Sequence, residues 1–297
     1  CGVEAFTGKG QLLRAGGRVL KNATDQILLQ LLCGSEGILG IFSQLTLRLL
    51  KKPLKTYWII APFKNIDDIA PVALKILSHP LLDPTMIEIM DALTLFCAEK
   101  FSGESLGFPD YNHLMVRFDG NDPQSVENFA SITGEICMDA GAEDVLAAES
   151  ASEQTRLWKI RSGTHEAIQN VIGSVCEEDV VVPIAAAGAM IIEARKISSD
   201  FDLPLAIFGH LGDGNLHINY SRKDPLDESP LPVDKLKDRI FAAATSLGGK
   251  ISGEHGIGIT KSKWFIKHAD PVYLSTLKKI KATLDPENII NPGKIIP

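Results

Sequence analysis

Two histidines stand seven residues apart in a glycine-rich segment, GHLGDGNLH at 209–217. Apolar stretches at 203–208 and 216–220 flank it and are each typical of a β-strand, while Gly-Asp-Gly-Asn in the middle is typical of a tight turn. A turn at this point would fold the two strands together. His210 at the end of one strand and His217 near the start of the next would then face a single point in space.

A carboxylate and a further imidazole follow in SGEHGIG at 252–258, where Glu254 and His255 are flanked by glycines. Two imidazoles and one carboxylate suit a divalent ion such as Zn²⁺ and leave a position open for a substrate oxygen. Asp213 could add a ligand, but it is better explained as a turn residue. The alternative for the histidines is turn chemistry alone, in which they only hydrogen-bond the backbone.

One arginine lies where it could hold an anion. Residues 153–172 are predicted to form a long helix, and Trp158, Arg161 and His165 fall on one face of it. A guanidinium can bind a substrate carboxylate through two parallel hydrogen bonds. An ordinary exposed helical arginine is the alternative.

The elements that must position these residues form two groups. Residues 1–53 combine predicted strands at 3–6 and 11–15, a short helix at 25–33, a glycine-rich stretch at 34–40 and a strand-like run at 41–50. Strands then alternate with helices: strands at 57–61, 113–118, 145–148 and 178–182, helices at 65–77, 125–140, 153–172, 185–197, 234–247 and 271–284. This order predicts an α+β fold with a sheet covered on one face.

Composition excludes several classes of protein. The 297 residues are 45% hydrophobic and 23% charged, with a net charge of −7, which excludes a disordered, collagen-like or coiled-coil chain and argues against nucleic-acid binding. The longest apolar run, 180–192, is interrupted by Pro183, and a membrane span needs about 18 apolar residues. We expect neither a span nor a signal peptide. Five scattered cysteines without a CxxC motif indicate reduced thiols.

Taken together, four motifs resemble a known family. GSEGILG at 34–40, GHLGDGNLH, SGEHGIG and NPGK at 291–294 are similar to the C-terminal domain of FAD-linked oxidases. That group includes the glycolate oxidase flavin subunit, D-lactate dehydrogenase and D-2-hydroxyglutarate dehydrogenase. The resemblance covers essentially the whole chain. It implies FAD-dependent, metal-assisted oxidation of a small D-2-hydroxy acid, of the glycolate or D-lactate type, to the 2-oxo acid, with hydride transfer to the flavin.

The resemblance also implies the domain organisation. Residues 54–297 would form the antiparallel-sheet cap domain of a vanillyl-alcohol-oxidase-type flavoprotein, with 285–297 returning to the flavin site. Residues 1–53 would be the C-terminal remnant of the FAD-binding domain. The glycine-rich pyrophosphate loops of the family lie upstream, and nothing in this sequence matches them. We therefore expect the chain to be a fragment that lacks most of the FAD site.

Individual roles follow from the resemblance. His210, His217 and Glu254 match the metal ligands, with zinc expected and iron or manganese as alternatives. His255 matches the catalytic base and contacts substrate. Arg161 and Asn219 match substrate-binding residues, Arg161 through the substrate carboxylate. The positions that match flavin contacts are Gly34, Ser35, Glu36, Gly37, Ile38, Gly40 and Asn291.

Three positions depart from the family pattern. Ile184 stands where family members often carry an arginine that could bind a second carboxylate, so a small monocarboxylate is favoured over a dicarboxylate. Ile38 and Ser43 both stand where threonine is common.

Partners and alternatives stay open. The resemblance implies an electron acceptor, which could be a quinone, an iron–sulfur subunit or an electron-transfer flavoprotein, and it is compatible with a homodimer. We expect a bacterial cytoplasmic or mitochondrial-matrix location, or peripheral attachment to a membrane through a partner. The alternative functions are a non-catalytic scaffold or interaction subunit and a metal-dependent hydrolase, although no HExxH helix supports the latter.

Because the upstream loops are unmatched, we expect the purified chain alone to hold little or no FAD. Its visible absorption spectrum checks this directly. A yellow chain with a flavin spectrum would contradict the expectation.

Overall fold

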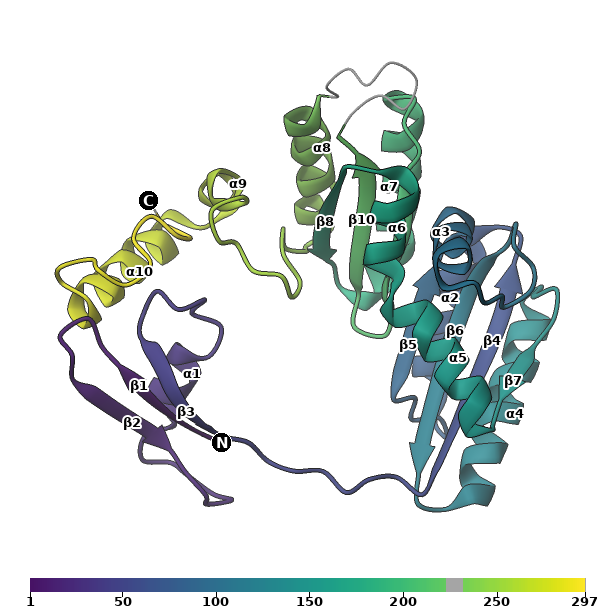
Figure 1. The fold of residues 1–297 in the computed structure, drawn as a ribbon, viewed down its shortest axis with the longest axis horizontal. Helices are drawn as coiled ribbons and strands as arrows, with labels where there is room; N and C mark the ends of the chain where they lie inside the picture. The colour runs from purple at the N-terminus through teal and green to yellow at the C-terminus, as the bar shows by residue number, and fades with distance from the viewer. Residues whose placement is uncertain (223–231, 297) are drawn as a thin grey trace. The chain divides into compact units, whose positions relative to one another are not determined.

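A computed structural model describes residues 1–222 and 232–296 (Figure 1). The chain forms two compact units, Cys1–Lys51 with His255–Pro297, and Lys52–Glu254. The motifs predict one domain over 54–297, but residues 255–296 group with the first unit. The reason is apolar packing: Ile257, Phe265 and Leu277 lie against the buried cluster around Val3 and Leu32. Residues 223–231 and 297 of that predicted domain lie outside the described residues.

The first unit is built on a three-stranded antiparallel sheet with the order β2-β1-β3. Its elements are β1 Gly2–Phe6, β2 Leu12–Gly16, α1 Gln26–Leu32, β3 Ile41–Thr46, α9 Ser262–His268 and α10 Pro271–Leu284. The predicted hairpin at 3–15 is confirmed, with Val3 paired to Ala15.

The second unit contains a seven-stranded sheet with the order β7-β4-β6-β5-β9-β10-β8, in which every pair is antiparallel. Its strands are β4 Lys55–Phe63, β5 Met86–Met90, β6 Asn112–Gly120, β7 Leu146–Ala148, β8 Val175–Val181, β9 Ala206–His210 and β10 Asn215–Ser221. Its α-helices are α2 Ile69–Leu77, α3 Ala92–Ser102, α4 Pro123–Asp139, α5 Ala151–Ser162, α6 Thr164–Ile172, α7 Ala187–Asp200 and α8 Val233–Ser246. The predicted α+β class is confirmed.

Helices cover both faces of this sheet, not one as predicted (Figure 1). Along β4, Trp58 and Ile60 point into a cluster formed with α3, α5 and α6. The alternate residues Ile59 and Ala61 are also buried, so they face the other side, where α4 packs on β4 and β6. Strands buried on both faces lose the apolar–polar alternation that would show a single covered face.

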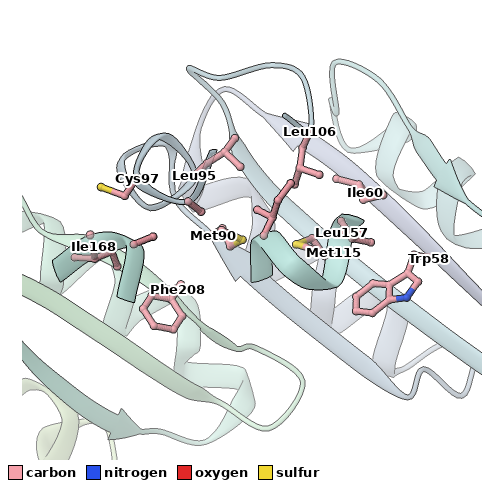
Figure 2. Close-up of a cluster of buried hydrophobic side chains, with 14 of the residues drawn as sticks. Trp58, Ile60, Met90, Leu95, Cys97, Leu106, Met115, Leu157, Ile168 and Phe208 are labelled. Carbon is pink, nitrogen blue, oxygen red and sulfur yellow. The ribbon is translucent and has the colours of Figure 1, made fainter. Parts of the chain in front are cut away.

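The cluster on the α3, α5 and α6 side joins helices to the centre of the sheet (Figure 2). The side chains labelled there are Trp58, Ile60, Met90, Leu95, Cys97, Leu106, Met115, Leu157, Ile168 and Phe208. It packs α3, α5 and α6 on the face of the sheet that also carries the histidines described below.

The prediction of one helix over 153–172 is wrong in one respect, because the segment forms two helices, α5 and α6. Gly163 has a ψ of 3° and separates α5 from α6. Glycine has low helix propensity, and the Thr164 hydroxyl bonds the carbonyls of Ile160 and Arg161, an arrangement that bends helices. Strand β5 and helices α3 and α9 were not predicted.

The described residues include no helix with both the length and the apolar character needed to cross a bilayer.

Asp91 connects β5, α3 and β9, and its removal is expected to cost stability. Its buried carboxylate accepts hydrogen bonds from the backbone N–H groups of Thr94 at 2.7 Å and Ile207 at 2.8 Å. Asp91→Ala leaves both donors without an acceptor, so we expect the free energy of unfolding to fall by about 3 kcal/mol. Chemical denaturation measures this. Asp122→Ala at the exposed N-cap of α4 is the control, with an expected loss of about 1 kcal/mol. Equal losses would contradict the account.

Candidate functional site

The hairpin of β9 and β10 brings the two histidines to one face of the sheet. His217 pairs with Phe208, and His210 is two residues further along β9, so all three side chains point the same way. The predicted hairpin is confirmed. Gly209 permits it, because a Cβ there would lie 2.4 Å from the carbonyl oxygen of Asn215.

Glu254 completes a cluster of three ligand-type side chains within this unit. Its Oε1 lies 3.2 Å from Nε2 of His210 and 3.3 Å from Nε2 of His217. The two imidazole rings are nearly perpendicular, with centroids 5.5 Å apart. Donors that share an ion at about 2.0–2.2 Å stand roughly 3–3.5 Å from one another. The spacing therefore fits a divalent cation.

The other nitrogen of His210 faces a carboxylate. Nδ1 lies 2.8 Å from Oε1 of Glu88, a buried residue on β5 directly opposite His210. The Glu88 carboxylate accepts hydrogen bonds, so it favours the tautomer in which Nδ1 carries the proton and the Nε2 lone pair is available to a cation. The same hydrogen bond raises the pKa of His210 above its ordinary value.

His217 has a comparable environment. Its ring stacks on Phe208 at 4.8 Å, and its Nδ1 lies 3.5 Å from Oε1 of Glu177 on β8. Glu177 also contacts His165 on α6. Burial opposes ionisation of Glu177, yet the hydrogen bond from His217 and the adjacent His165 hold its pKa below the ordinary value. Both imidazoles thus have Nε2 towards Glu254 and Nδ1 towards a carboxylate.

A third buried carboxylate, Asp179, anchors the segment that carries Glu254. Its Oδ2 accepts bonds from Ser252 Oγ at 2.9 Å and from the backbone N–H groups of Gly253 and Glu254 at 3.0 Å each. Its Oδ1 accepts from Asn215 Nδ2 at 2.7 Å. A Cβ at Gly253 would collide with Asn215 and Asp179, which explains the glycine before Glu254.

Arg161 is buried beside this cluster. Its Nε and Nη2 donate to Oε2 of Glu88 at 2.9 and 2.6 Å, and its guanidinium lies 5.2 Å from the ring centroid of Phe208. It is therefore no ordinary exposed helical arginine. The two donors of its fork are occupied by Glu88, and Nη1 makes no hydrogen bond to the described residues.

Of the two other residues predicted to contact substrate, Asn219 is buried and His255 is exposed. Asn219 is fully buried on the same face of β10, and neither atom of its amide has a hydrogen-bond partner among the described residues. His255 is exposed and follows Glu254 directly, but it is the first residue of the segment that belongs to the first unit.

In the first unit, most of the predicted flavin contacts surround one pocket. A cavity of about 410 Å³ is lined by Gly34, Ser35, Glu36, Gly37 and Gly40, together with Leu32, Ile41, Phe42 and Asn291. The Ser35 hydroxyl is buried and has no hydrogen-bond partner among the described residues. The predicted contact Ile38 does not line this cavity, because its side chain packs in the hydrophobic core of the unit.

Two residues of this group also hold the first unit together. The Glu36 carboxylate accepts bonds from the N–H groups of Ile257 and Gly258, each at 2.8 Å. Asn291 donates from Nδ2 to the Gly37 carbonyl at 2.9 Å. The glycine-rich segment 34–40 is thereby joined to residues 257–258 and to Asn291, all within the first unit.

Three carboxylates of the second unit, Glu88, Glu177 and Asp179, were missed from the sequence. A signal for each was present, since MIEIM at 86–90 and VCEEDVV at 175–181 place acidic residues inside apolar strands. A buried carboxylate is costly unless it is paired, so such a residue marks a polar network or a site.

Comparison with known proteins decides the family. The family described as FAD linked oxidases, C-terminal domain, matches residues 52–295. The chain belongs to this family. Among curated FAD-linked oxidases, D-lactate dehydrogenase of Anaerostipes hadrus is 33% identical over 96% of the chain, and glycolate oxidase subunit GlcD of Bacillus subtilis is 29% identical over 99%. The chain spans 62% of the length of each.

A solved structure extends the likeness to the fold of these oxidases. The chain aligns over its full length with 65% of p-cresol methylhydroxylase, at a TM-score of 0.74 and 15% sequence identity. The fold is that of vanillyl-alcohol-oxidase-type flavoproteins, as the motifs predicted.

Asp179→Ala is expected to release the segment that carries Glu254. The amide of Glu254 loses its side-chain acceptor, so its hydrogen exchange should accelerate strongly, whereas the Gly253 amide keeps the backbone carbonyl of residue 179 as an acceptor at 3.2 Å. The Lys250 amide, bonded to the Val181 carbonyl at 2.8 Å, is the internal control and should keep its protection. Unchanged exchange at Glu254 would show that the Asp179 side chain does not anchor the segment.

Proposed function

We propose that the chain forms the substrate domain of an FAD-linked enzyme that oxidises a small D-2-hydroxy acid to the 2-oxo acid. The observation that carries the proposal is the cluster of His210, His217 and Glu254, in which both imidazoles turn Nε2 towards the same carboxylate. Family membership and relatives named D-lactate dehydrogenase and glycolate oxidase subunit support it.

The donor set of this cluster fits a divalent cation, with zinc best matched by two imidazoles and one carboxylate. His210, His217 and Glu254 would hold it. When bound there, the cation would supply Lewis-acid polarisation that lowers the pKa of the substrate hydroxyl. The proposal leaves a coordination position for that hydroxyl, because three of the described residues would serve as ligands here.

The first unit would contribute to the flavin site. Residues 34–37, Gly40 and Asn291 line a cavity, and the Ser35 hydroxyl lacks a protein partner, which suits contact with a polar ligand. When bound, FAD would accept the hydride from the substrate Cα, which no protein side chain can do.

His255 would take the proton of the substrate hydroxyl. An imidazole is a common general base, and this one is exposed and directly follows the proposed ligand Glu254. The unpartnered amide of Asn219 would hydrogen-bond the substrate. Arg161 would bind the substrate carboxylate through Nη1, since its Nε and Nη2 are committed to Glu88.

The charges in the second unit favour a monocarboxylate. Glu88, Glu177, Asp179 and Glu254 all lie around the two histidines, whereas Arg161 is the one guanidinium that the described part of the chain places there. A second substrate carboxylate would meet repulsion, and Ile184 supplies no cation for it. We therefore propose glycolate or D-lactate as substrates, with a quinone, an iron–sulfur subunit or an electron-transfer flavoprotein as the open alternatives for the electron acceptor.

The assay is reduction of an artificial electron acceptor by the chain with FAD and with the N-terminal FAD-binding part of a family member supplied in trans. We expect turnover with glycolate or D-lactate, and kcat/KM for D-2-hydroxyglutarate at least about 10-fold lower because of the unpaired second carboxylate. Absence of turnover with all three acids in a flavin-loaded complex would contradict the proposal.

His255→Gln should lower kcat in that assay by about 100- to 10,000-fold, the usual contribution of a general base. His79→Gln is the matched control, because His79 follows α2 and its ring accepts a bond from the Leu81 amide. Equal activities of the two variants would remove His255 from the mechanism.

A further inference from the structure

The Glu88 carboxylate is shared between two functional side chains. Oε1 accepts the Nδ1 proton of His210 at 2.8 Å, while Oε2 accepts from Nε and Nη2 of Arg161 at 2.9 and 2.6 Å. Glu88 is buried on β5 and touches neither His217 nor Glu254 in any described hydrogen bond or ion pair. It therefore acts on the cluster only through His210 and Arg161.

We propose that Glu88 is a positioning residue that makes His210 a metal ligand by fixing its tautomer, with Arg161 holding the Glu88 carboxylate in place through two hydrogen bonds. This rests on the proposed function, since it assigns the cation to the same cluster. The 3.4 Å approach of Arg161 Nη2 to His210 Nδ1 is not a competing hydrogen bond. A guanidinium has only donors, and in the proposed tautomer Nδ1 is also a donor, because its N–H is directed at Glu88. Two donors cannot form a hydrogen bond with each other.

An amide at position 88 cannot satisfy both neighbours. Glu88→Gln keeps the size of the side chain but has one acceptor and one donor group, whereas Arg161 and His210 both present donors. The charged guanidinium is the stronger donor and takes the amide oxygen. The amide NH₂ then faces His210 and favours a proton on Nε2, the nitrogen that must bind the cation. The substitution should therefore weaken cation binding with little change in packing.

The experiment measures Zn²⁺ affinity of the full chain by competition with a chromophoric chelator, with Co²⁺ absorption spectra as a second readout. Loss of partners behind a metal-binding histidine typically weakens affinity about 10- to 100-fold, and we expect Glu88→Gln to fall in that range. The Co²⁺ spectrum should change as the imidazole ligand is lost.

A matched control exists on the same sheet. Glu178 is equally buried and bonds the Tyr220 hydroxyl at 2.8 Å and Lys237 Nζ at 3.0 Å, but it points to the α8 face, away from the cluster. Glu178→Gln should cost stability without changing Zn²⁺ affinity.

A double variant separates tautomer control from a merely structural role. In Glu88→Gln with Arg161→Met, the amide oxygen is free to turn to His210, so part of the lost Zn²⁺ affinity should return. Wild-type affinity in Glu88→Gln, or no recovery in the double variant, would overturn the role of Glu88 while leaving the cation site intact. A wild-type chain that binds no Zn²⁺ would overturn both the role and the proposed site.

Discussion

The antiparallel register of β9 and β10 is the constraint on which the rest of the site depends. It pairs Phe208 with His217 and places His210 two residues away on the same face, so both imidazoles approach Glu254 from adjacent strands. A shift of one residue would turn one imidazole to the opposite face, which is filled by apolar side chains under α7 and α8. The close approach of Gly209 to Asn215 pins this register.

Buried negative charge is the second determinant of the site. Glu88, Glu177 and Asp179 lie behind the histidines and Glu254, and Glu88 is paired with the guanidinium of Arg161. Burying carboxylates is expensive unless hydrogen bonds or opposite charges compensate, and a divalent cation held by the two imidazoles and Glu254 would offset part of that cost. The same carboxylates thus orient the two imidazoles, anchor the segment of Glu254 and hold Arg161.

Much of the fold could be predicted because its signals are local. The turn residues at 212–215 predicted the hairpin at 209–217, and the alternation of strands with helices predicted the α+β class. Strand β5 was missed because its five residues follow no clear alternation, and Glu88 was missed with it. Its partnership with His210 joins residues 122 apart in the chain, which local patterns cannot show. The break at Gly163 was missed because the apolar periodicity of 153–172 continues through it, and the hydrogen bonds of the Thr164 hydroxyl to Ile160 and Arg161 are not visible in that pattern.

The central claim is that His210, His217 and Glu254 hold a divalent cation, and elemental analysis by mass spectrometry tests it most directly. The account predicts near-stoichiometric zinc, iron or manganese in the freshly purified chain, and loss of that metal in a His210→Ala/His217→Ala double variant that remains folded by circular dichroism. A metal-free wild-type chain that also fails to take up Zn²⁺, or a double variant that retains its metal, would contradict it.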